Sequence, residues 1–178
     1  MFRWDEGEEK PLNPFNTAFL STIRERPSAV VISDYDKGFL PPDVCCEIVE
    51  HYKKIDKNIH IFVDSKKTDL SCFEGCYIKI NDREYENITK HPKDCRYIIT
   101  LGASGTRYLD TVYETNKVEV FDVCGAGDVF LSALTYGYLI NEDIVKAIEI
   151  SNRCASYSVT KMGTYVISRE ELKELKVL

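Results

Sequence analysis

The chain has 178 residues, of which 44% are apolar, and its 23 basic and 29 acidic side chains give a formal net charge of −6. These proportions are ordinary for a globular protein and exclude extensive intrinsic disorder. No apolar run approaches the roughly 18 residues of a membrane-spanning helix, and an acidic chain is a poor general binder of nucleic acid, so we expect neither a membrane nor a nucleic acid as a partner.

Short apolar runs typical of buried strands alternate along the chain with amphipathic segments typical of helices. Residues 1–14 are predicted to be irregular, and residues 15–25 to form a helix that Pro27 ends. The predicted strands are 29–32, 59–63, 76–80 and 96–101, followed by a hairpin of 107–112 and 117–121. The predicted helices are 41–57, 125–139, 142–160 and a short last one after a capping box of Ser168 and Glu171.

Strands that alternate with helices indicate an α/β protein with a mostly parallel sheet. Four of the predicted strands end in polar or glycine-rich segments, namely 33–38, 64–66, 81–84 and 102–105. Because ligands of such sheets bind beside the carboxyl ends of the strands, we expect a site where these four segments meet.

The sharpest local pattern is the segment 122–128, which leads directly into an amphipathic helix. Gly125 and Gly127 allow a ligand to approach the backbone closely, and their amides with that of Ala126 would form an anion site at a helix N-terminus. A carboxylate beside an anion site suits a group that takes a proton from an attacking hydroxyl, which is the role we expect for Asp128. A plain turn from strand to helix fits the same spacing, and the spacing alone does not separate the two.

The run from Gly125 to Asp128 resembles the C-terminal signature of the ribokinase-like (PfkB) carbohydrate kinases, and further segments agree in chain order. Residues 81–84 resemble the Asn-x-x-Glu motif of that family, and residues 100–105 resemble its Thr-x-Gly-x-x-Gly nucleotide loop. Residues 151–152 and 161–164 resemble its nucleotide-base region.

One branch of the family is the most similar, namely the heptose-7-phosphate kinase domain of the bifunctional ADP-heptose enzymes. Residues 33–38 resemble the Ser-Asp-Tyr-x-Lys-Gly segment of that branch, residues 64–66 its Asp-Pro-Lys, and residues 3–5 its Arg-x-Asp entry segment. Cys124 replaces a threonine that is common in the family signature, and Ser65 replaces the proline of Asp-Pro-Lys. Neither departure touches the expected base or anion site.

The resemblance implies ATP-dependent phosphoryl transfer to a hydroxyl of a sugar or sugar phosphate, with ATP and Mg²⁺ as cofactors. Asp128 would be the base, and the amides of Gly125, Ala126 and Gly127 would stabilise the transferring group. The implied nucleotide-binding residues are Thr100, Gly102, Gly105, Asn152, Lys161 and Gly163. Asn81 and Glu84 would organise Mg²⁺ through water. Asp34 and Lys37 would contact the substrate.

Ordinary structural roles fit several of these residues equally well. Asn81 and Glu84 have the spacing of a helix N-cap, the glycines at 102 and 105 fit a plain turn, and Lys37 fits a solvated surface lysine.

The resemblance further implies a three-layer α/β/α sandwich in which residues 1–178 form a single C-terminal domain of ribokinase type. The N-terminal half and the β-lid of the family have no counterpart in this sequence. We therefore expect a homo-oligomer or a complementing N-terminal chain, because a shortened sheet exposes a hydrogen-bonding edge. The alternative functions are a non-catalytic nucleotide-binding or assembly module derived from such a kinase, and a remnant that binds no nucleotide.

The seven cysteines are an odd number, and the first residues turn acidic without an apolar run, so we expect reduced thiols and a cytoplasmic protein. A competing site is carried by the spacing of Cys72 and Cys76 with His91 and Cys95, which would suit zinc if the two pairs met.

Overall fold

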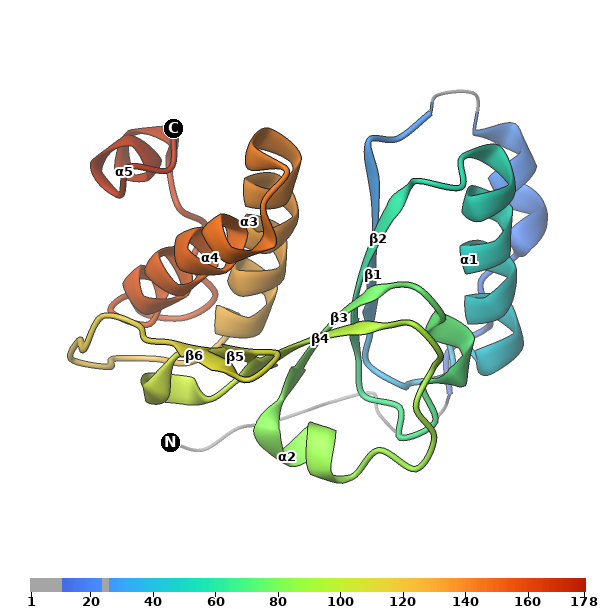
Figure 1. Cartoon of the computed structure of the whole chain (residues 1–178), viewed down its shortest axis with the longest axis horizontal. Helices are drawn as coiled ribbons and strands as arrows, with labels where there is room; N and C mark the ends of the chain where they lie inside the picture. Colours follow the sequence, from blue (N-terminus) through green and yellow to red (C-terminus); the bar gives the residue numbers. More distant parts are fainter. Residues whose placement is uncertain (1–10, 24–25) are drawn as a thin grey trace.

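The computed structural model describes residues 11–23 and 26–178, so residues 3–5 and most of the predicted irregular segment lie outside the described residues. Six strands form one sheet in the order β1-β2-β3-β4-β5-β6 (Figure 1). The strands are β1 (Ala29–Asp34), β2 (His60–Ser65), β3 (Tyr77–Asn81), β4 (Arg96–Thr100), β5 (Thr106–Tyr108) and β6 (Thr111–Tyr113). The first four are parallel and the last two form an antiparallel hairpin, which confirms the mostly parallel α/β sheet.

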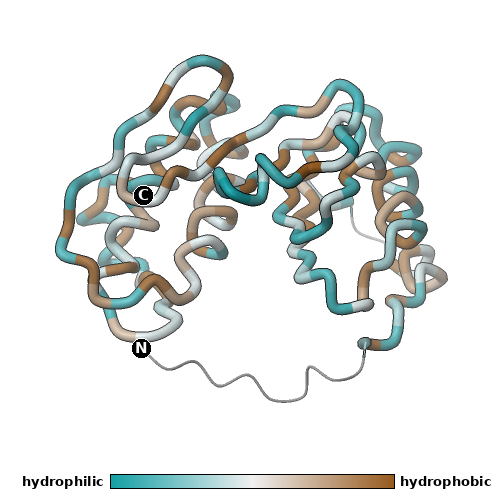
Figure 2. Tube along the Cα trace, turned by 90° about the horizontal axis from the view of Figure 1, so that it is seen from below, coloured by the Kyte–Doolittle hydropathy of each residue, from teal (hydrophilic) through white to brown (hydrophobic). Residues whose placement is uncertain are grey.

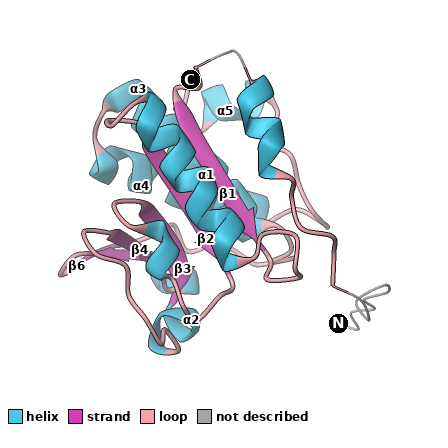
Figure 3. Ribbon diagram, turned by 90° about the vertical axis from the view of Figure 1, so that its right-hand side faces the viewer, coloured by secondary structure: helices cyan, strands magenta, loops and turns pink. Residues whose placement is uncertain are grey.

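Helices cover both faces of this sheet. The helix α1 (Pro42–Ile55) lies across one face, where Figure 3 shows it in front of β1 and β2. The helices α3 (Ala126–Asn141) and α4 (Ile144–Ser158) cover the other face and pack closely against each other. The short helices α2 (Asp82–Glu86) and α5 (Arg169–Glu174) lie at the periphery (Figure 1).

Alternation along the strands explains the two apolar layers. In β2, Ile61 and Val63 join the core under α1, whereas Phe62 joins the core under α3 and α4. Successive side chains of a strand point to opposite faces, so the next residue on the α3 side is Asp64. This period places polar groups of neighbouring strands on one face at the carboxyl end of the sheet.

Apolar and polar residues alternate at short intervals along the whole described trace (Figure 2). Among the described residues, no helix is both long enough and apolar enough to cross a membrane.

The predicted helix at 15–25 is wrong in type and length. The structure has a 3₁₀-helix at Thr17–Thr22, and residues 24–25 lie outside the described part of the chain. The Ser21 and Thr22 hydroxyls donate to carbonyl oxygens three residues earlier, which favours the tighter winding. Phe19 within this segment is exposed, so the apolar spacing did not correspond to a buried helix face.

The predicted hairpin is also in the wrong place. The strand β5 turns at Leu109 and Asp110 and pairs with β6, and residues 117–121 form no strand. The amides of Phe121 and Asp122 instead donate to the carbonyl oxygen of Val159 at 2.7 and 3.1 Å. The apolar residues of 117–121 alternate as in a strand, but the backbone at the end of this segment hydrogen-bonds to the end of α4.

Gly105 joins the nucleotide-loop segment to β5 with φ of 97°, and a Cβ there would overlap the Tyr113 carbonyl oxygen. We expect Gly105→Ala to lower the free energy of unfolding by about 2–5 kcal/mol, since backbone strain and steric overlap add. The matched control is Gly102→Ala, where φ is 57° and a Cβ would meet nothing within 4 Å. It should cost only the left-handed backbone strain of about 1–2 kcal/mol. Urea unfolding of both variants measures the difference, and equal losses would contradict this assignment.

Candidate active site

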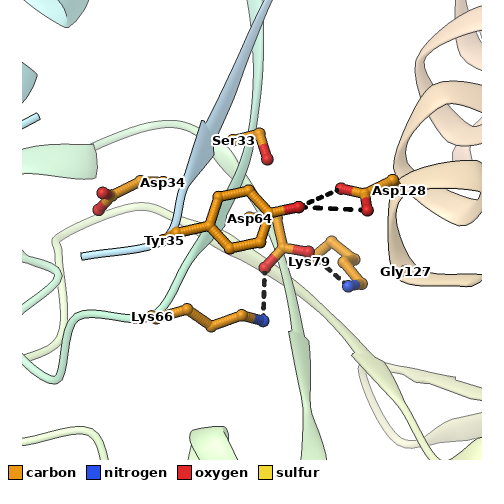
Figure 4. A pocket seen from close by; sticks show the side chains of 8 residues that line it. All are labelled: Ser33, Asp34, Tyr35, Asp64, Lys66, Lys79, Gly127 and Asp128. Carbon is orange, nitrogen blue, oxygen red and sulfur yellow. Dashed lines mark hydrogen bonds and ion pairs between the residues drawn. The ribbon is translucent and has the colours of Figure 1, made fainter. Parts of the chain in front are cut away.

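A cavity of about 100 Å³ lies between the carboxyl ends of β1, β2 and β3 and the first turn of α3 (Figure 4). Polar and charged residues line it, and it holds the expected base together with groups from three strands. The lining residues are Ser33, Asp34, Tyr35, Asp64, Lys66, Lys79, Gly127 and Asp128. Of the four segments predicted to meet, 33–38 and 64–66 contribute residues to this cavity, whereas 81–84 and 102–105 do not line it.

Two glycines shape the start of α3. Gly125 is the N-cap residue and has φ of 75°, and a Cβ there would lie 2.9 Å from Cγ2 of Thr164. A Cβ on Gly127 would lie 2.8 Å from the Lys79 ammonium nitrogen. The Ala126 amide donates to the Val123 carbonyl oxygen at 3.2 Å. The amides of Gly125 and Gly127 are therefore the better-placed donors for an anion at this helix terminus.

The Asp128 carboxylate accepts hydrogen bonds from the hydroxyl of Tyr35, whose Oη lies 3.1 Å from Oδ1 and 3.2 Å from Oδ2. Burial and the hydrogen bond to Asp128 raise the pKa of Tyr35, so its hydroxyl keeps its proton and donates. The sequence analysis missed Tyr35 as a site residue. The sequence could have indicated Tyr35, because it lies in the polar segment 33–38 after β1, which resembles a family motif.

A chain of charged groups lines the floor of the cavity. Asp64 and Lys79 are partners in the register of β2 and β3, and their side chains form a buried ion pair with Oδ2 and Nζ 2.5 Å apart. Lys66 bonds the other Asp64 oxygen at 3.2 Å and the Glu84 carboxylate at 2.8 Å. Burial opposes the charge on Lys66, but the hydrogen bond to Glu84 and the charge of Asp64 outweigh it and raise its pKa. The sequence analysis also missed Lys79, a lone charge within an apolar strand.

The two predicted substrate residues differ in their surroundings. Asp34 is buried and lines the cavity, but it accepts hydrogen bonds from the Ser65 hydroxyl at 2.7 Å and from Lys67 at 2.9 Å. Lys67 also bonds Asp36 at 2.6 Å, so one buried lysine joins both aspartates of the segment. Lys37 is exposed and is not among the residues that line this cavity.

The predicted magnesium residues form a complete capping box at the start of α2. The Asn81 side chain accepts from the Glu84 amide at 2.8 Å, and the Glu84 carboxylate accepts from the Asn81 amide at 3.1 Å. The remaining Glu84 oxygen bonds Lys66. These internal partners confirm the helix-capping role of the two residues, and their role towards magnesium stays a prediction.

The zinc alternative is wrong for the part of the chain that the structure describes. No group of three or more His, Cys, Asp and Glu side chains suited to a metal ion lies within residues 11–23 and 26–178. His91 bonds the Tyr97 hydroxyl at 2.9 Å, and Cys76 is buried in the core under α1.

The predicted nucleotide loop follows β4, beside the capping box. Thr100 is the register partner of Asn81, and its hydroxyl donates to the Ile80 carbonyl oxygen at 3.3 Å. Gly102 is exposed with open space around its Cα, whereas Gly105 is packed tightly. The sheet register therefore brings this loop next to the residues expected to organise magnesium.

The remaining predicted nucleotide residues are engaged within the protein. Asn152 is buried; it accepts from the Thr106 hydroxyl at 2.7 Å and donates to the Tyr113 carbonyl oxygen at 2.9 Å. The Lys161 ammonium lies 4.5 Å from the ring centre of Tyr157. The Gly163 amide donates to Asp122 at 3.0 Å, which ties the signature segment to the C-terminal part. Asn152 thus holds the hairpin on α4, a role that the sequence analysis did not foresee.

This geometry can be compared with known proteins. The model of the pfkB family of carbohydrate kinases matches residues 24–171. The chain is also 34% identical over 170 residues to the bifunctional protein HldE of Campylobacter jejuni, an alignment that covers 83% of this chain and 36% of the relative. The chain belongs to the PfkB family of carbohydrate kinases.

Solved structures show the same fold. Phosphofructokinase-2 of Escherichia coli matches with a TM-score of 0.70 at 18% identity over 84% of this chain and 57% of that one. Ribokinase of Arabidopsis thaliana, solved with ribose and ATP, matches with a TM-score of 0.69 at 14% identity over 93% of this chain and 60% of that one. The fold is therefore ribokinase-like. The chain spans about a third of the length of the curated relatives it matches and little over half of the solved kinases.

Lys79→Met should lower the free energy of unfolding by about 2–4 kcal/mol, because it leaves the buried Asp64 with only the partly exposed Lys66 as a partner. The double variant Asp64→Leu with Lys79→Met should recover most of that loss, since an apolar pair replaces the ion pair. Urea unfolding of the single and double variants measures the coupling. Losses that simply add would show that the two side chains do not act as a pair.

Hydrogen bonds from Tyr157, the Ser168 amide and Tyr165 lower the pKa of Glu171 from its ordinary 4.5 to about 2. A depressed carboxyl pKa stabilises the fold above the unfolded value, and this stabilisation is lost as the pH falls from about 4.5 towards about 2. We expect the stability gap between the wild type and Glu171→Gln to close over that range in urea titrations. Glu170→Gln, which changes the neighbouring exposed carboxylate, is the control and should show no such change. A gap that is independent of pH would contradict the assignment.

Proposed function

We propose that this chain carries the nucleotide-binding and base-bearing part of a carbohydrate kinase that transfers a phosphoryl group from ATP to a sugar or sugar-phosphate hydroxyl. The observation that carries the proposal is the arrangement around Asp128. Its carboxylate opens into the same cavity as Gly127, at a helix N-terminus beside the buried ammonium of Lys79. The HldE relatives favour a heptose phosphate as the acceptor, in keeping with the motif at residues 33–38.

In this reaction, Asp128 accepts the proton of the acceptor hydroxyl as that oxygen attacks the γ-phosphorus of ATP. The bond from the γ-phosphorus to the bridging oxygen then breaks, and ADP leaves with the electron pair. The amides of Gly125 and Gly127, with a smaller share from Ala126, would stabilise the negative charge of the transferring group. Lys79 would add a fixed positive charge beneath Gly127.

Mg²⁺ would neutralise charge on the ATP phosphates when bound. Asn81 and Glu84 would hold its water ligands, and Thr100, Gly102 and Gly105 would bring the neighbouring loop to the nucleotide. Gly163, Lys161 and Asn152 would support the nucleotide-base region from α4 and the segment after it. Asp34 and Lys37 would orient the acceptor together with the residues between them.

The acceptor site would be completed by further strands added at β1. Within the part of the chain that the structure describes, this strand has a neighbouring strand on one side only, and Val31 on its α3 face is 48% exposed. Exposed strand edges are seldom left unpaired, so we propose a homo-oligomer or a complementing N-terminal chain at this edge. The seven free thiols suit a cytoplasmic setting.

A second candidate is a nucleotide-binding or assembly module without catalysis. It is favoured by the internal bonds of Asp34 and Asn152. The two candidates differ in the consequence of removing the Asp128 charge.

Thermal unfolding with Mg·ATP tests nucleotide binding first. At about 100 times the dissociation constant, binding adds roughly 2.7 kcal/mol, which should raise Tm by roughly 5–11 °C in a domain of this size. The wild type and Asp128→Asn should both show the rise, because the base contacts the acceptor rather than the nucleotide. Asp110→Asn, in the exposed hairpin turn, is the matched control.

Phosphoryl transfer to a panel of sugar phosphates then separates the candidates. Asp128→Asn should lower the rate about 10²- to 10⁴-fold, as expected for a general base, and Asp110→Asn should not. Nucleotide binding with no transfer, even with a complementing chain, would favour the assembly module. No Tm rise in any of the three proteins would refute the kinase proposal.

A further inference from the structure

The hydroxyl of Tyr35 lies between the cavity and the expected base. It donates to both oxygens of Asp128, at 3.1 and 3.2 Å, while the side chain as a whole is 56% exposed. Figure 4 shows the ring reaching across the cavity from the end of β1 to the first turn of α3. Two segments 93 residues apart in the sequence thus meet at a single polar contact.

This contact occupies the position that an acceptor needs. A carboxylate that removes a proton must have the reacting hydroxyl within about 2.6–3.2 Å. The Tyr35 hydroxyl is an O–H donor at the upper limit of that range. It therefore competes with an acceptor hydroxyl for the same oxygens of Asp128.

Water competes for the same position. The cavity of about 100 Å³ is lined by polar and charged side chains, and liquid water takes about 30 Å³ per molecule, so several water molecules fit beside Asp128. A water molecule on this carboxylate, next to the amide of Gly127, would have the base and the anion site that phosphoryl transfer requires.

The backbone on both sides of Tyr35 is anchored, but its ring is not packed in a core. Asp34 is held by Ser65 and Lys67, at 2.7 and 2.9 Å. Asp36 bonds Lys67 at 2.6 Å, and its amide donates to Asp34 at 3.0 Å. The exposed ring can therefore rotate away from Asp128 about its own side-chain bonds, with little loss of buried contact and no movement of the loop.

We propose, on the basis of the proposed kinase function, that Tyr35 guards the base. Without an acceptor it occupies Asp128 and prevents activation of water against ATP, and the arriving sugar hydroxyl displaces it. Tyr35 is thus a residue that determines specificity for a sugar hydroxyl over water.

The side reaction that Tyr35 prevents is ATP hydrolysis. When the hydroxyl of Tyr35 is removed, a water molecule gives its proton to Asp128 and its oxygen forms a bond to the γ-phosphorus. The bond from the γ-phosphorus to the bridging oxygen breaks, so ATP and water yield ADP and inorganic phosphate. The reaction needs no sugar, and it can be followed by phosphate release.

The experiment compares Mg·ATP hydrolysis without sugar in the wild type, Tyr35→Phe, Asp128→Asn and the double variant. Because a hydrogen bond to a charged group is worth roughly a 10- to 100-fold change in an equilibrium, Tyr35→Phe should hydrolyse ATP at least about tenfold faster than the wild type. The double variant should be as slow as Asp128→Asn. Tyr136→Phe, which changes an exposed tyrosine of α3, is the matched control and should leave the rate unchanged.

Other results would overturn the proposal that Tyr35 protects Asp128 from water. An unchanged rate in Tyr35→Phe, with nucleotide binding intact by thermal shift, would overturn it and leave the kinase proposal standing. A faster rate that persists in the double variant would also overturn it, because Asp128 would not be the mediator. A mass gain of one phosphoryl group on Tyr35 would also overturn it, because the phenol would then be an acceptor itself. Absence of nucleotide binding in all variants would refute the proposed function and, with it, the proposed role of Tyr35.

Discussion

The buried ion pair between Asp64 and Lys79 connects the sheet to the first turn of α3. The pair exists because the parallel register of β2 and β3 makes these residues neighbours on one face. A Cβ on Gly127 would lie 2.8 Å from this ammonium nitrogen, so a larger residue there would displace the Lys79 side chain. A buried ion pair costs free energy to desolvate unless it is well bonded, and here Lys66 supplies a further contact to Asp64.

The same pair determines the electrostatics of the cavity. Lys79 and the N-terminus of α3 make the floor beneath Gly127 positive, while Asp64 and Asp128 supply negative charge on either side. This separation suits a reaction in which a proton moves to a carboxylate as negative charge develops next to it. A site built only to hold an anion would not need a carboxylate at the position of Asp128.

Several residues at the strand ends serve the fold as well as the expected chemistry. Asn81 and Glu84 start α2 through a capping box, and Asn152 holds the hairpin of β5 and β6 against α4. The ordinary interpretation of the Asn81 and Glu84 spacing as a helix cap is thus correct, and it leaves a role for them through water open. Asn152 shows the limit of motif comparison, because its amide bonds depend on a hairpin that the sequence pattern placed wrongly.

The sequence by itself determined the class of fold, the places of the four parallel strands along the chain and two segments that line the cavity, 33–38 and 64–66. Those features depend on local periodicity and on glycine positions, which are visible in the order of residues. Only the tertiary structure decided the contact of Tyr35 with Asp128, the pairing of Lys79 with Asp64 and the bonding of residues 121–122 to the end of α4. These contacts join segments far apart in the chain, and their partners are selected by strand register and helix packing, which no local pattern encodes.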